Sequence, residues 1–300
     1  MDCLLTITIL TFNSEKYISD TLLSVANQAN KSLQLVISDD NSSDKTVGVI
    51  QSFLETYEKL FFEVVLLVND ENIGILGNKK RTFPHIKGKW VKGLAGDDML
   101  EANAIKNMEE DMEEFKHHEV IVGQAQIFRN NQIENLSIPN RKVIHRLIDN
   151  TKIKNYLFEG YTIPAICLLV KSELLIKSDP FKNAKRNFED VPFHLELLSN
   201  NVQFVFSNKQ YILYRKHENN VSSKHKEDIL SRHYIDYQKI LLKYAIRDKR
   251  FLYTLNSFWN LAFGTMIIQF GNKGKFLSML NWMRVKLQPK RMKNAFIAPF

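Results

Sequence analysis

Short apolar runs alternate with helix-like stretches through the first hundred residues, and this alternation restricts the fold more than any other feature of the chain. The apolar runs span residues 4–10, 34–38, 62–68 and 90–95, and the segments between them carry apolar residues at helical spacing. Because parallel strands need long crossover connections, usually helices, the pattern predicts an α/β fold. We expect a Rossmann-like, mostly parallel sheet flanked by helices, with strands covered on both faces.

The chain beyond residue 100 first continues this pattern and then becomes helical. Residues 101–116 are predicted to form a helix whose acidic side chains face solvent, and residues 130–150 a polar loop or lid. Further strands, helices or short apolar segments are predicted at residues 120–128, 153–158, 163–170, 190–198, 202–206 and 211–217. We therefore predict an α/β domain over residues 1–223 and a C-terminal helical, basic region over residues 224–300.

Composition and cysteine use point to a packed protein in a reducing compartment. The hydrophobic fraction of 44% is ample for a core. Cys3 and Cys167 provide neither a disulfide framework nor the spacing of a zinc site. The N-terminus does not read as a signal peptide, because Asp2 stands where positive charge belongs and threonines interrupt the apolar run. These features predict a cytoplasmic location.

Positive charge is concentrated at the C-terminal end of the chain. The net charge is +8, and residues 249–300 contain nine Lys and Arg residues with no Asp or Glu, so the preceding part is close to neutral. Nucleic acid or an anionic membrane surface could attract such a tail. RNA-binding aromatic signatures are missing and the charges lie in a tail rather than a groove, so we do not expect nucleic acid to bind.

The segment from residue 251 to 270 has the length of a membrane span and no charged residue. Polar residues interrupt it repeatedly, including Thr254, Asn256 and Asn260. We therefore predict an amphipathic or buried helix here and not a transmembrane span. The aromatic residues of the tail would let it lie on a membrane surface as a peripheral anchor, or pack against a second subunit; helical periodicity alone does not separate these alternatives.

Two adjacent carboxylates, Asp97 and Asp98, follow the apolar run at 90–95, with Gly96 before them. Open α/β sheets bind their ligands at the C-terminal ends of the strands. Two carboxylates this close repel each other unless a cation lies beside them, and their hard oxygen ligands suit Mg²⁺ or Mn²⁺, which in turn suit a diphosphate. The alternative is that Asp97 only caps a helix that begins near Glu101.

Several further motifs occur in a characteristic order and spacing. In chain order they are Thr11-Phe12-Asn13, Gln28, residues 38–46 (SDDNSSDKT), Asn72-Ile73-Gly74, Arg81, residues 87–90 (KGKW), residues 95–98 (AGDD), Glu189-Asp190 and residues 214–217 (YRKH). Together they resemble the family 2 glycosyltransferases of the GT-A fold, especially bacterial enzymes that build surface polysaccharides. The resemblance covers about residues 4–223 and is most specific in the first hundred.

The resemblance implies a nucleotide-sugar donor, with UDP the expected nucleotide. Asp40 can accept a hydrogen bond from the uracil N–H, and the segment that contains Thr11, Asn13 and Glu15 can hold the base and ribose. Arg81 can bind a phosphate with two hydrogen bonds. The alternatives are a turn or helix cap for Asp40 and a plain surface position for Arg81.

The resemblance also implies the metal ligands and the base of an inverting reaction. Asp98, with Asp97, would hold Mn²⁺ or Mg²⁺ against the departing diphosphate. Asp190, with Glu189 as neighbour, would deprotonate the acceptor hydroxyl, although carboxylates also suit a helix N-terminus. His217 would contact the diphosphate or metal, or else be an ordinary loop histidine.

The predicted function is transfer of a sugar to a saccharide acceptor, lipid-linked, at the inner face of a bacterial membrane, in O-antigen or capsule synthesis. A nucleotidyltransferase would need a glycine-rich, basic phosphate loop after the first strand, and residues 11–15 supply none. The non-enzymatic alternative is a basic-tailed binding module, which loss of metal-dependent UDP binding would favour.

Overall fold

The computed structural model describes residues 3–129, 132–139, 147, 149–177, 179–183, 189–218 and 232–270. The chain divides into two compact units. The first unit comprises residues 1–152 and 163–217, and the second comprises residues 153–162 and 218–300. The predicted domain boundary at residues 223 and 224 lies outside the described residues.

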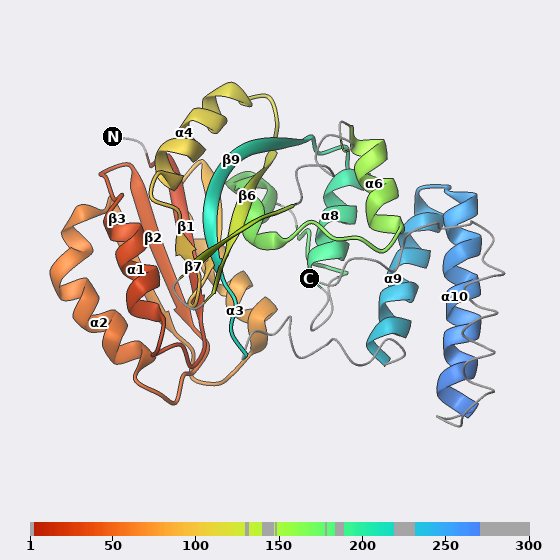
Figure 1. The fold of residues 1–300 in the computed structure, drawn as a ribbon, viewed down its shortest axis with the longest axis horizontal. Coiled ribbons are helices and arrows are strands. Elements are labelled where there is room, and N and C mark those ends of the chain that lie inside the picture. The colour runs from red at the N-terminus through yellow and green to blue at the C-terminus, as the bar shows by residue number, and fades with distance from the viewer. Residues whose placement is uncertain are drawn as a thin grey trace. The chain divides into compact units, whose positions relative to one another are not determined.

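The first half of the sheet confirms the predicted α/β fold. Four parallel strands lie in the order β3-β2-β1-β4, and a helix follows each of the first three along the chain (Figure 1). β1 and β2 are almost fully buried, because both of their neighbours in the sheet and the flanking helices cover them. The elements are β1 (Leu5–Thr11), α1 (Ile18–Ala26), β2 (Leu33–Asp39), α2 (Thr46–Tyr57), β3 (Glu63–Val68), α3 (Gly74–Thr82) and β4 (Trp90–Ala95).

The second half of the sheet mixes strand directions. β8 joins β4 to β6 by antiparallel pairing, β6 pairs with β9 in parallel, and β7 pairs with β6 off this path. Figure 1 shows β9 curving alongside β6. The elements are β5 (Met99–Leu100), α4 (Ala104–Glu114), β6 (Val120–Arg129), β7 (Gln132–Ile138), α6 (Asn150–Phe158), the 3-10 turn η3 (Ala165–Cys167), β8 (Leu168–Lys171), α7 (Ser172–Ile176), α8 (Asp190–Ser199) and β9 (Phe204–Arg215).

Three local predictions were wrong. β3 is only half-buried because it forms the sheet edge, so it is not covered on both faces. The predicted loop at 130–150 contains β7, and the two strands predicted at 202–206 and 211–217 are one strand, β9.

The acidic helix α4 does not present all of its carboxylates to solvent. Asp111 is almost fully buried and accepts a hydrogen bond from the Tyr211 hydroxyl, while its other oxygen lies 2.9 Å from the Lys209 ammonium. Burial of a carboxylate is tolerated where it is paired in this way. The helix therefore has one acidic contact inside the protein, through β9, in addition to its solvated face.

The second unit contains a hairpin of two helices, α9 (Arg232–Arg247) and α10 (Phe251–Phe270). Lys249 closes α9 with a left-handed φ of 54°, and the Arg250 amide donates to the Ala245 carbonyl at 2.8 Å, which is the pattern of a helix C-terminal cap. The predicted helix at 251–270 is confirmed. None of the described helices combines the length and apolarity needed to cross a membrane.

The polarity of α10 is the reverse of an ordinary surface helix. Asn256, Ser257 and Asn260 are buried, whereas Phe251 and Phe258 expose 71% and 65% of their surface. Leu252 and Leu255 are exposed on the same helix. Water is a poor environment for such a stripe of large apolar side chains.

Candidate active site

The C-terminal ends of three neighbouring strands bring the predicted site residues together. β1 lies between β2 and β4, with Thr11 opposite Asp39 and Leu10 opposite Ala95. The chain runs from β1 to β2 and β3 on one side and then crosses through α3 to β4 on the other side of β1, which makes this a topological switch point, the usual place for a ligand in an open α/β sheet. The segments that follow Thr11, Asp39 and Ala95 therefore share one edge.

Side chains predicted to bind the nucleotide hold two of these loops against each other. The Thr11 hydroxyl donates to Asp39 at 2.7 Å, and the Asn13 carboxamide oxygen accepts from the Ser43 amide at 2.9 Å. A Glu15 carboxylate oxygen accepts from the Lys45 amide at 2.8 Å. Thr11 is buried, whereas Asn13 and Glu15 are exposed at the edge. Their visible role is to fix the shape of the loop after β2.

Asp40 and Arg81 lie in one hydrogen-bond network. The buried Asp40 carboxylate accepts from the backbone amides of Ile73 and Gly74 and from the Asn69 carboxamide, each at 2.9 Å. The Arg81 guanidinium donates to the same Asn69 side chain. Asp40 thus holds the N-terminus of α3, so part of the helix-cap alternative is realised. A carboxylate offers about four acceptor positions, and donors from the described residues occupy three of those of Asp40.

Asp97 and Asp98 lie at the end of β4 and are held from β9. Asp98 is almost fully buried and accepts from the Arg215 backbone amide at 2.9 Å. The Asp97 carbonyl accepts from the Arg215 side chain at 2.8 Å, and its carboxylate lies 2.9 Å from the His217 Nε2. The alternative in which Asp97 caps the following helix is wrong, because α4 begins only at Ala104, after Asn103.

Close packing at Gly96 fixes where the two carboxylates emerge. A Cβ atom at this position would lie 2.8 Å from the Thr11 Cγ2 and 3.1 Å from the Ser14 Oγ. The Thr21 hydroxyl, from α1, donates to the carbonyls of both Gly96 and Asp98. A side chain larger than hydrogen would therefore push the Asp97-Asp98 segment away from the strand ends.

Arg215 is a central residue of the site that sequence reasoning did not assign. Its guanidinium reaches Asp20 at 2.8 Å and lies over the Tyr17 ring, 4.8 Å from the ring centroid. The signal was present: a basic residue at the end of a largely apolar strand is buried, and a buried cation needs carboxylate or carbonyl partners. His217 packs on the same Tyr17 ring, so its contact with the Asp97 carboxylate is accompanied by an aromatic one.

Burial and mutual repulsion both disfavour the charged form of Asp98. Burial, followed by the charge of Asp97, raises the pKa of Asp98 well above its ordinary value, although Lys92 and Arg215 oppose this. The described residues contain no group of three or more side chains that could hold a metal without other ligands. Mg²⁺ is commonly bound by one or two carboxylates together with substrate phosphates, and Asp97 and Asp98 fit that arrangement.

Asp190 is the first residue of α8, with Glu189 at the N-cap position. Shielding from water by the surrounding protein raises the pKa of Asp190 to about 6, with the Glu189 charge adding to the rise. The Lys79 charge and a hydrogen bond from the Ala165 backbone N–H act in the opposite direction. A carboxylate with a pKa near neutrality is suited to accept and release a proton at physiological pH.

Asp98 and Asp190 both interact electrostatically with the buried Cys167 thiol. Burial raises the pKa of Cys167 to about 12, and the charges of Asp98 and Asp190 both contribute to the rise. Cys3 and Cys167 are both buried and unbridged. Because both carboxylates act on one side chain in η3, the structure brings the metal pair and the predicted base to the same part of the first unit.

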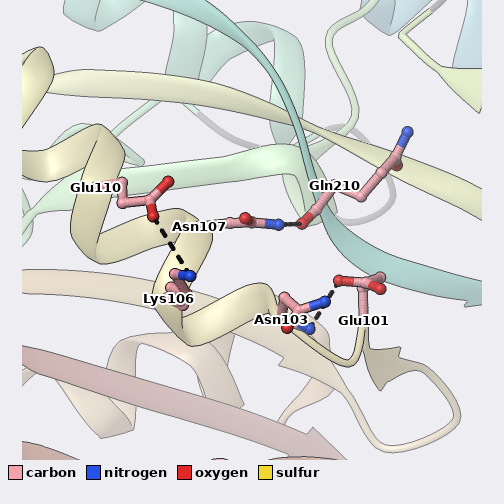
Figure 2. A pocket seen from close by; sticks show the side chains of 6 residues that line it. All are labelled: Glu101, Asn103, Lys106, Asn107, Glu110 and Gln210. Atoms are coloured by element: carbon pink, nitrogen blue, oxygen red, sulfur yellow. Dashed lines mark hydrogen bonds and ion pairs between the residues drawn. The ribbon is translucent and has the colours of Figure 1, made fainter.

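A hollow elsewhere in this unit has different chemistry. It has a volume of about 450 Å³ and lies beside α4 (Figure 2). Its side chains largely contact one another: Asn107 donates to the Gln210 carbonyl and Lys106 pairs with Glu110. None of the predicted site residues lines it, so we place the site at the strand ends. The lining residues are Glu101, Asn103, Lys106, Asn107, Glu110 and Gln210.

Phe12 is a second residue that sequence reasoning left unassigned. It follows β1 directly, between Thr11 and Asn13, and exposes 51% of its surface. A half-exposed aromatic ring at a strand end offers a flat face to a planar ligand. Its position in the Thr11-Phe12-Asn13 motif was the signal that could have indicated it.

Curated relatives of the chain are glycosyltransferases. A GalNAc(5)-diNAcBac-PP-undecaprenol beta-1,3-glucosyltransferase of Campylobacter jejuni is 29% identical over 130 residues, which span 43% of this chain but only 38% of that protein. An Escherichia coli protein, UDP-Glc:alpha-D-GlcNAc-diphosphoundecaprenol beta-1,3-glucosyltransferase WfgD, is 25% identical over 74% of this chain and 81% of its own length. A dTDP-rhamnosyl transferase of Shigella flexneri, RfbG, is 24% identical over 222 residues.

Solved glycosyltransferase structures share the fold. TarS 1-349 of S. aureus in complex with UDP-GlcNAc superimposes with a TM-score of 0.59 at 16% identity, covering 86% of this chain and 73% of that one. The mannosyltransferase PcManGT of Pyrobaculum calidifontis, in complex with GDP-Man and Mn²⁺, gives a TM-score of 0.57 at 12% identity over 96% of this chain and 81% of that one. The first unit thus has the GT-A fold that the sequence predicts.

The family profile named Glycosyl transferase family 2 matches residues 6–167, more than half of the chain. The match begins in β1 and ends in η3, so it contains the three strand ends and the Asp97-Asp98 pair. The chain therefore belongs to glycosyl transferase family 2.

Proposed function

We propose that this glycosyltransferase moves a sugar from a uridine-linked nucleotide sugar to a saccharide hydroxyl, with inversion at the anomeric carbon. The observation that carries the proposal is the grouping of three features in one unit. These are the Asp40–Arg81 network, the Asp97-Asp98 pair and the Asp190 carboxylate with its pKa near 6. Together they supply a base-reading acceptor, a charge site for a diphosphate and a general base.

The pyrimidine preference is supported by what Asp40 and Phe12 offer. Uracil presents one ring N–H between two carbonyls, and the Asp40 carboxylate can accept a further hydrogen bond from that N–H. The exposed Phe12 ring can stack on the base. Arg81, tied to Asp40 through Asn69, can pair with a phosphate. The name of the Escherichia coli relative contains UDP-Glc and that of the Shigella relative dTDP, and thymine has the same N–H, so the test must include both pyrimidines.

The metal would be held by Asp98 with Asp97, and Mn²⁺ or Mg²⁺ bound there would neutralise charge on the leaving diphosphate. Asp190 would take the proton of the acceptor hydroxyl. The acceptor oxygen would then bond to the anomeric carbon on the face opposite the diphosphate, as the bond from that carbon to the diphosphate oxygen breaks. One displacement of this kind inverts the configuration.

The acceptor is proposed to be a lipid-linked saccharide at the inner face of the plasma membrane, in synthesis of a surface polysaccharide such as O-antigen or capsule. Support comes from two relatives whose names specify undecaprenol-linked acceptors. The exposed Phe251 and Phe258 of α10, followed by a chain end with no acidic residue, suit a peripheral contact with anionic lipid. The alternative partner for this apolar face of α10 is a second copy of the chain.

A ligand panel tests the proposal directly. Thermal shift is measured with UDP-, dTDP-, GDP- and CMP-linked sugars, each with and without Mn²⁺, and transfer to a lipid-linked acceptor is followed for any donor that binds. We expect stabilisation by a UDP-sugar that depends on the metal, and a product whose anomeric configuration, read by NMR, is opposite to that of the donor. Stabilisation by GDP-sugars alone, or a retained configuration, would contradict it.

A further inference from the structure

Lys92 is a fully buried lysine in the middle of β4, with no exposed surface. Lysine is almost never buried in this way unless it is paired, because removing its ammonium from water is costly. Its Nζ donates to the Gly93 carbonyl at 3.1 Å and to the Ile166 carbonyl in η3. These contacts satisfy the ammonium, and they also connect two separate elements of the first unit.

The topology explains why a long donor is needed here. β8 pairs with β4 only from Trp90 to Lys92, and the chain that enters β8 comes from η3. The β4–β8 ladder does not continue past Lys92, so it supplies no donor to the Gly93 and Ile166 carbonyls. Buried backbone carbonyls require donors, and the Lys92 ammonium provides them to one carbonyl on each side.

The other side of η3 contacts the proposed base. The Ala165 backbone N–H, adjacent to Ile166, acts on the Asp190 carboxylate and lowers its pKa. Lys92 and Asp190 therefore both interact with η3: Lys92 by a hydrogen bond to the Ile166 carbonyl, and Asp190 through its electrostatic interaction with the Ala165 N–H. β4 itself continues to the Asp97-Asp98 pair, so one strand carries the metal carboxylates and also anchors the support of the base.

We propose that Lys92 is a positioning residue for the transfer reaction: its ammonium fixes η3 so that the Ala165 N–H holds the Asp190 carboxylate toward the acceptor hydroxyl. The inference rests on the proposed role of Asp190 as the general base. Burial lowers the pKa of Lys92 to about 8, and the charges of Cys167 and Asp98 oppose this decrease. Lys92 is therefore protonated in most molecules at neutral pH and keeps its N–H donors. The other charged or titratable groups that act on Asp190 are Glu189 beside it, Lys79 of α3 and Cys167 of η3.

The alternative to positioning through hydrogen bonds is a charge effect, because the Lys92 charge also acts on Asp98. Two substitutions distinguish these mechanisms. Lys92→Met keeps an unbranched side chain but removes both the donors and the charge. Lys92→Gln removes the charge but retains an N–H donor that can reach toward the Ile166 carbonyl. A positioning role through hydrogen bonds predicts that Gln restores much of what Met loses.

The measurements are steady-state kinetics across pH and binding of UDP with Mn²⁺. For Lys92→Met we expect kcat to fall about tenfold, as small misplacements of a catalytic group can cost this much or more, while the donor KM and UDP affinity stay within a factor of about two. The acid limb of kcat/KM should move up by about one pH unit, as expected when an ionised carboxylate loses one hydrogen bond. Lys92→Gln should return the limb most of the way toward wild type.

A double-mutant cycle with Asp190→Asn separates failure of this inference from failure of the proposed function. If Asp190→Asn keeps near-wild-type turnover, Asp190 is not the base and the proposed function is at fault. If Asp190→Asn is severely impaired, adding Lys92→Met should cost little more, because both changes act on one step. A full additional loss in the double variant overturns the positioning role.

Two further outcomes would overturn it. One is an unmoved acid limb in Lys92→Met. The other is a Lys92→Gln protein that binds UDP with Mn²⁺ at least about tenfold more weakly, since the charge would then act on the metal carboxylates. If Lys92→Met does not give folded protein by circular dichroism, Lys92→Gln alone decides: a near-normal acid limb and UDP affinity support the inference, and loss of either contradicts it.

Discussion

Asp98 occupies a position that is unfavourable for a charged carboxylate until a cation binds. Because its pKa is raised in the folded protein, the folded state retains a proton that the unfolded state releases, and stability falls as pH rises from about 4 toward the folded pKa. Asp98→Asn keeps an oxygen for the Arg215 amide and removes the charge. Without metal, we expect this variant to melt at a higher temperature than wild type at pH 8.

The same substitution should abolish function. Transfer should fall at least about 100-fold, because a metal clamp on a leaving group contributes several kcal/mol to the transition state. Melting curves with and without Mn²⁺ provide the comparison: wild type should gain stability from UDP with Mn²⁺, and Asp98→Asn should not. A variant that retains metal-dependent stabilisation would move the metal site away from this residue.

Burial raises the pKa of Asp190 to about 6, and the Lys79 charge opposes this rise. The proposed reaction needs the ionised carboxylate, so kcat/KM should rise with pH through about 6 and level off above it. The Lys79 charge lowers the Asp190 pKa, so Lys79→Met should move the acid limb to higher pH and leave the plateau nearly unchanged. Lys80→Met, on the same helix but paired with Asp179, is the matched control. A limb that moves equally in both variants would point to a general charge effect.

Some residues of the candidate site could be predicted from the sequence and others could not. Asp40, Asp97 and Asp98 were readable because each follows an apolar run, and strand ends are where ligands bind. Arg215 was not, since its partners Asp98 and Asp20 lie 117 and 195 residues away along the chain. No local period or spacing encodes such a contact. The roles of the predicted site residues in binding and catalysis stay predictions.

Among the elements, α3 depends on a carboxylate from a neighbouring strand end. Asp40 accepts from the first amides of this helix, and we propose that it also reads the nucleotide base. Asp40→Ala should therefore lower stability by about 1–2 kcal/mol, as loss of a helix cap does. It should also weaken UDP binding about 10- to 100-fold, because a hydrogen bond to an ionised group contributes roughly 1.5–3 kcal/mol.

Asp149→Ala provides the control for this prediction. Asp149 accepts from the Lys152 amide in the first turn of α6, so its removal should also cost stability. We expect its UDP affinity, measured by calorimetry, to stay within about threefold of wild type, since a surface change away from the base contact has little effect on it. Equal loss of UDP affinity in the two variants would mean that Asp40 acts only through the stability of the protein.

Elements with a clear apolar period were predicted well, and the errors have local causes. β9 was divided in two because Ser207, Lys209 and Gln210 interrupt its apolar pattern. The structure accommodates them by pairing Gln210 with Gln124 and Lys209 with Asp111, next to register shifts between β6 and β9. β7 was missed because its sequence is mostly polar, and only pairing with β6 makes it a strand.

For the whole molecule, the second unit offers a surface whose occupant can be tested. Phe251 and Phe258 would insert at the headgroup level of an anionic leaflet, and each basic residue nearby contributes about 1 kcal/mol. We expect the protein to sediment with anionic vesicles at low salt, less so at high salt, and not with neutral vesicles. Phe251→Ser together with Phe258→Ser should weaken this binding.

A second set of substitutions tests the charged end of the chain. Lys286, Lys290, Arg291 and Lys293 lie outside the described residues, and changing them to Gln should weaken vesicle binding in the same assay. Light scattering tests the alternative, which is dimerisation through α10. If the protein does not bind anionic vesicles but forms a dimer, and Phe251→Ser with Phe258→Ser disrupts that dimer, then the α10 face binds a second copy of the chain. Transfer to a short, lipid-free acceptor should be unchanged in all of these variants.

The hydrogen bond between Asp98 and the Arg215 amide has a consequence during synthesis of the protein. The ribosome delivers Asp98 117 residues before its partner, and the family-profile match has already ended at residue 167. A nascent chain that stops short of β9 therefore has the whole sequence that matches the family profile but lacks the strand that holds the Asp97-Asp98 pair. Competence to bind a donor should appear late and abruptly on the ribosome, when β9 pairs with β6, which keeps unfinished chains from sequestering nucleotide sugars.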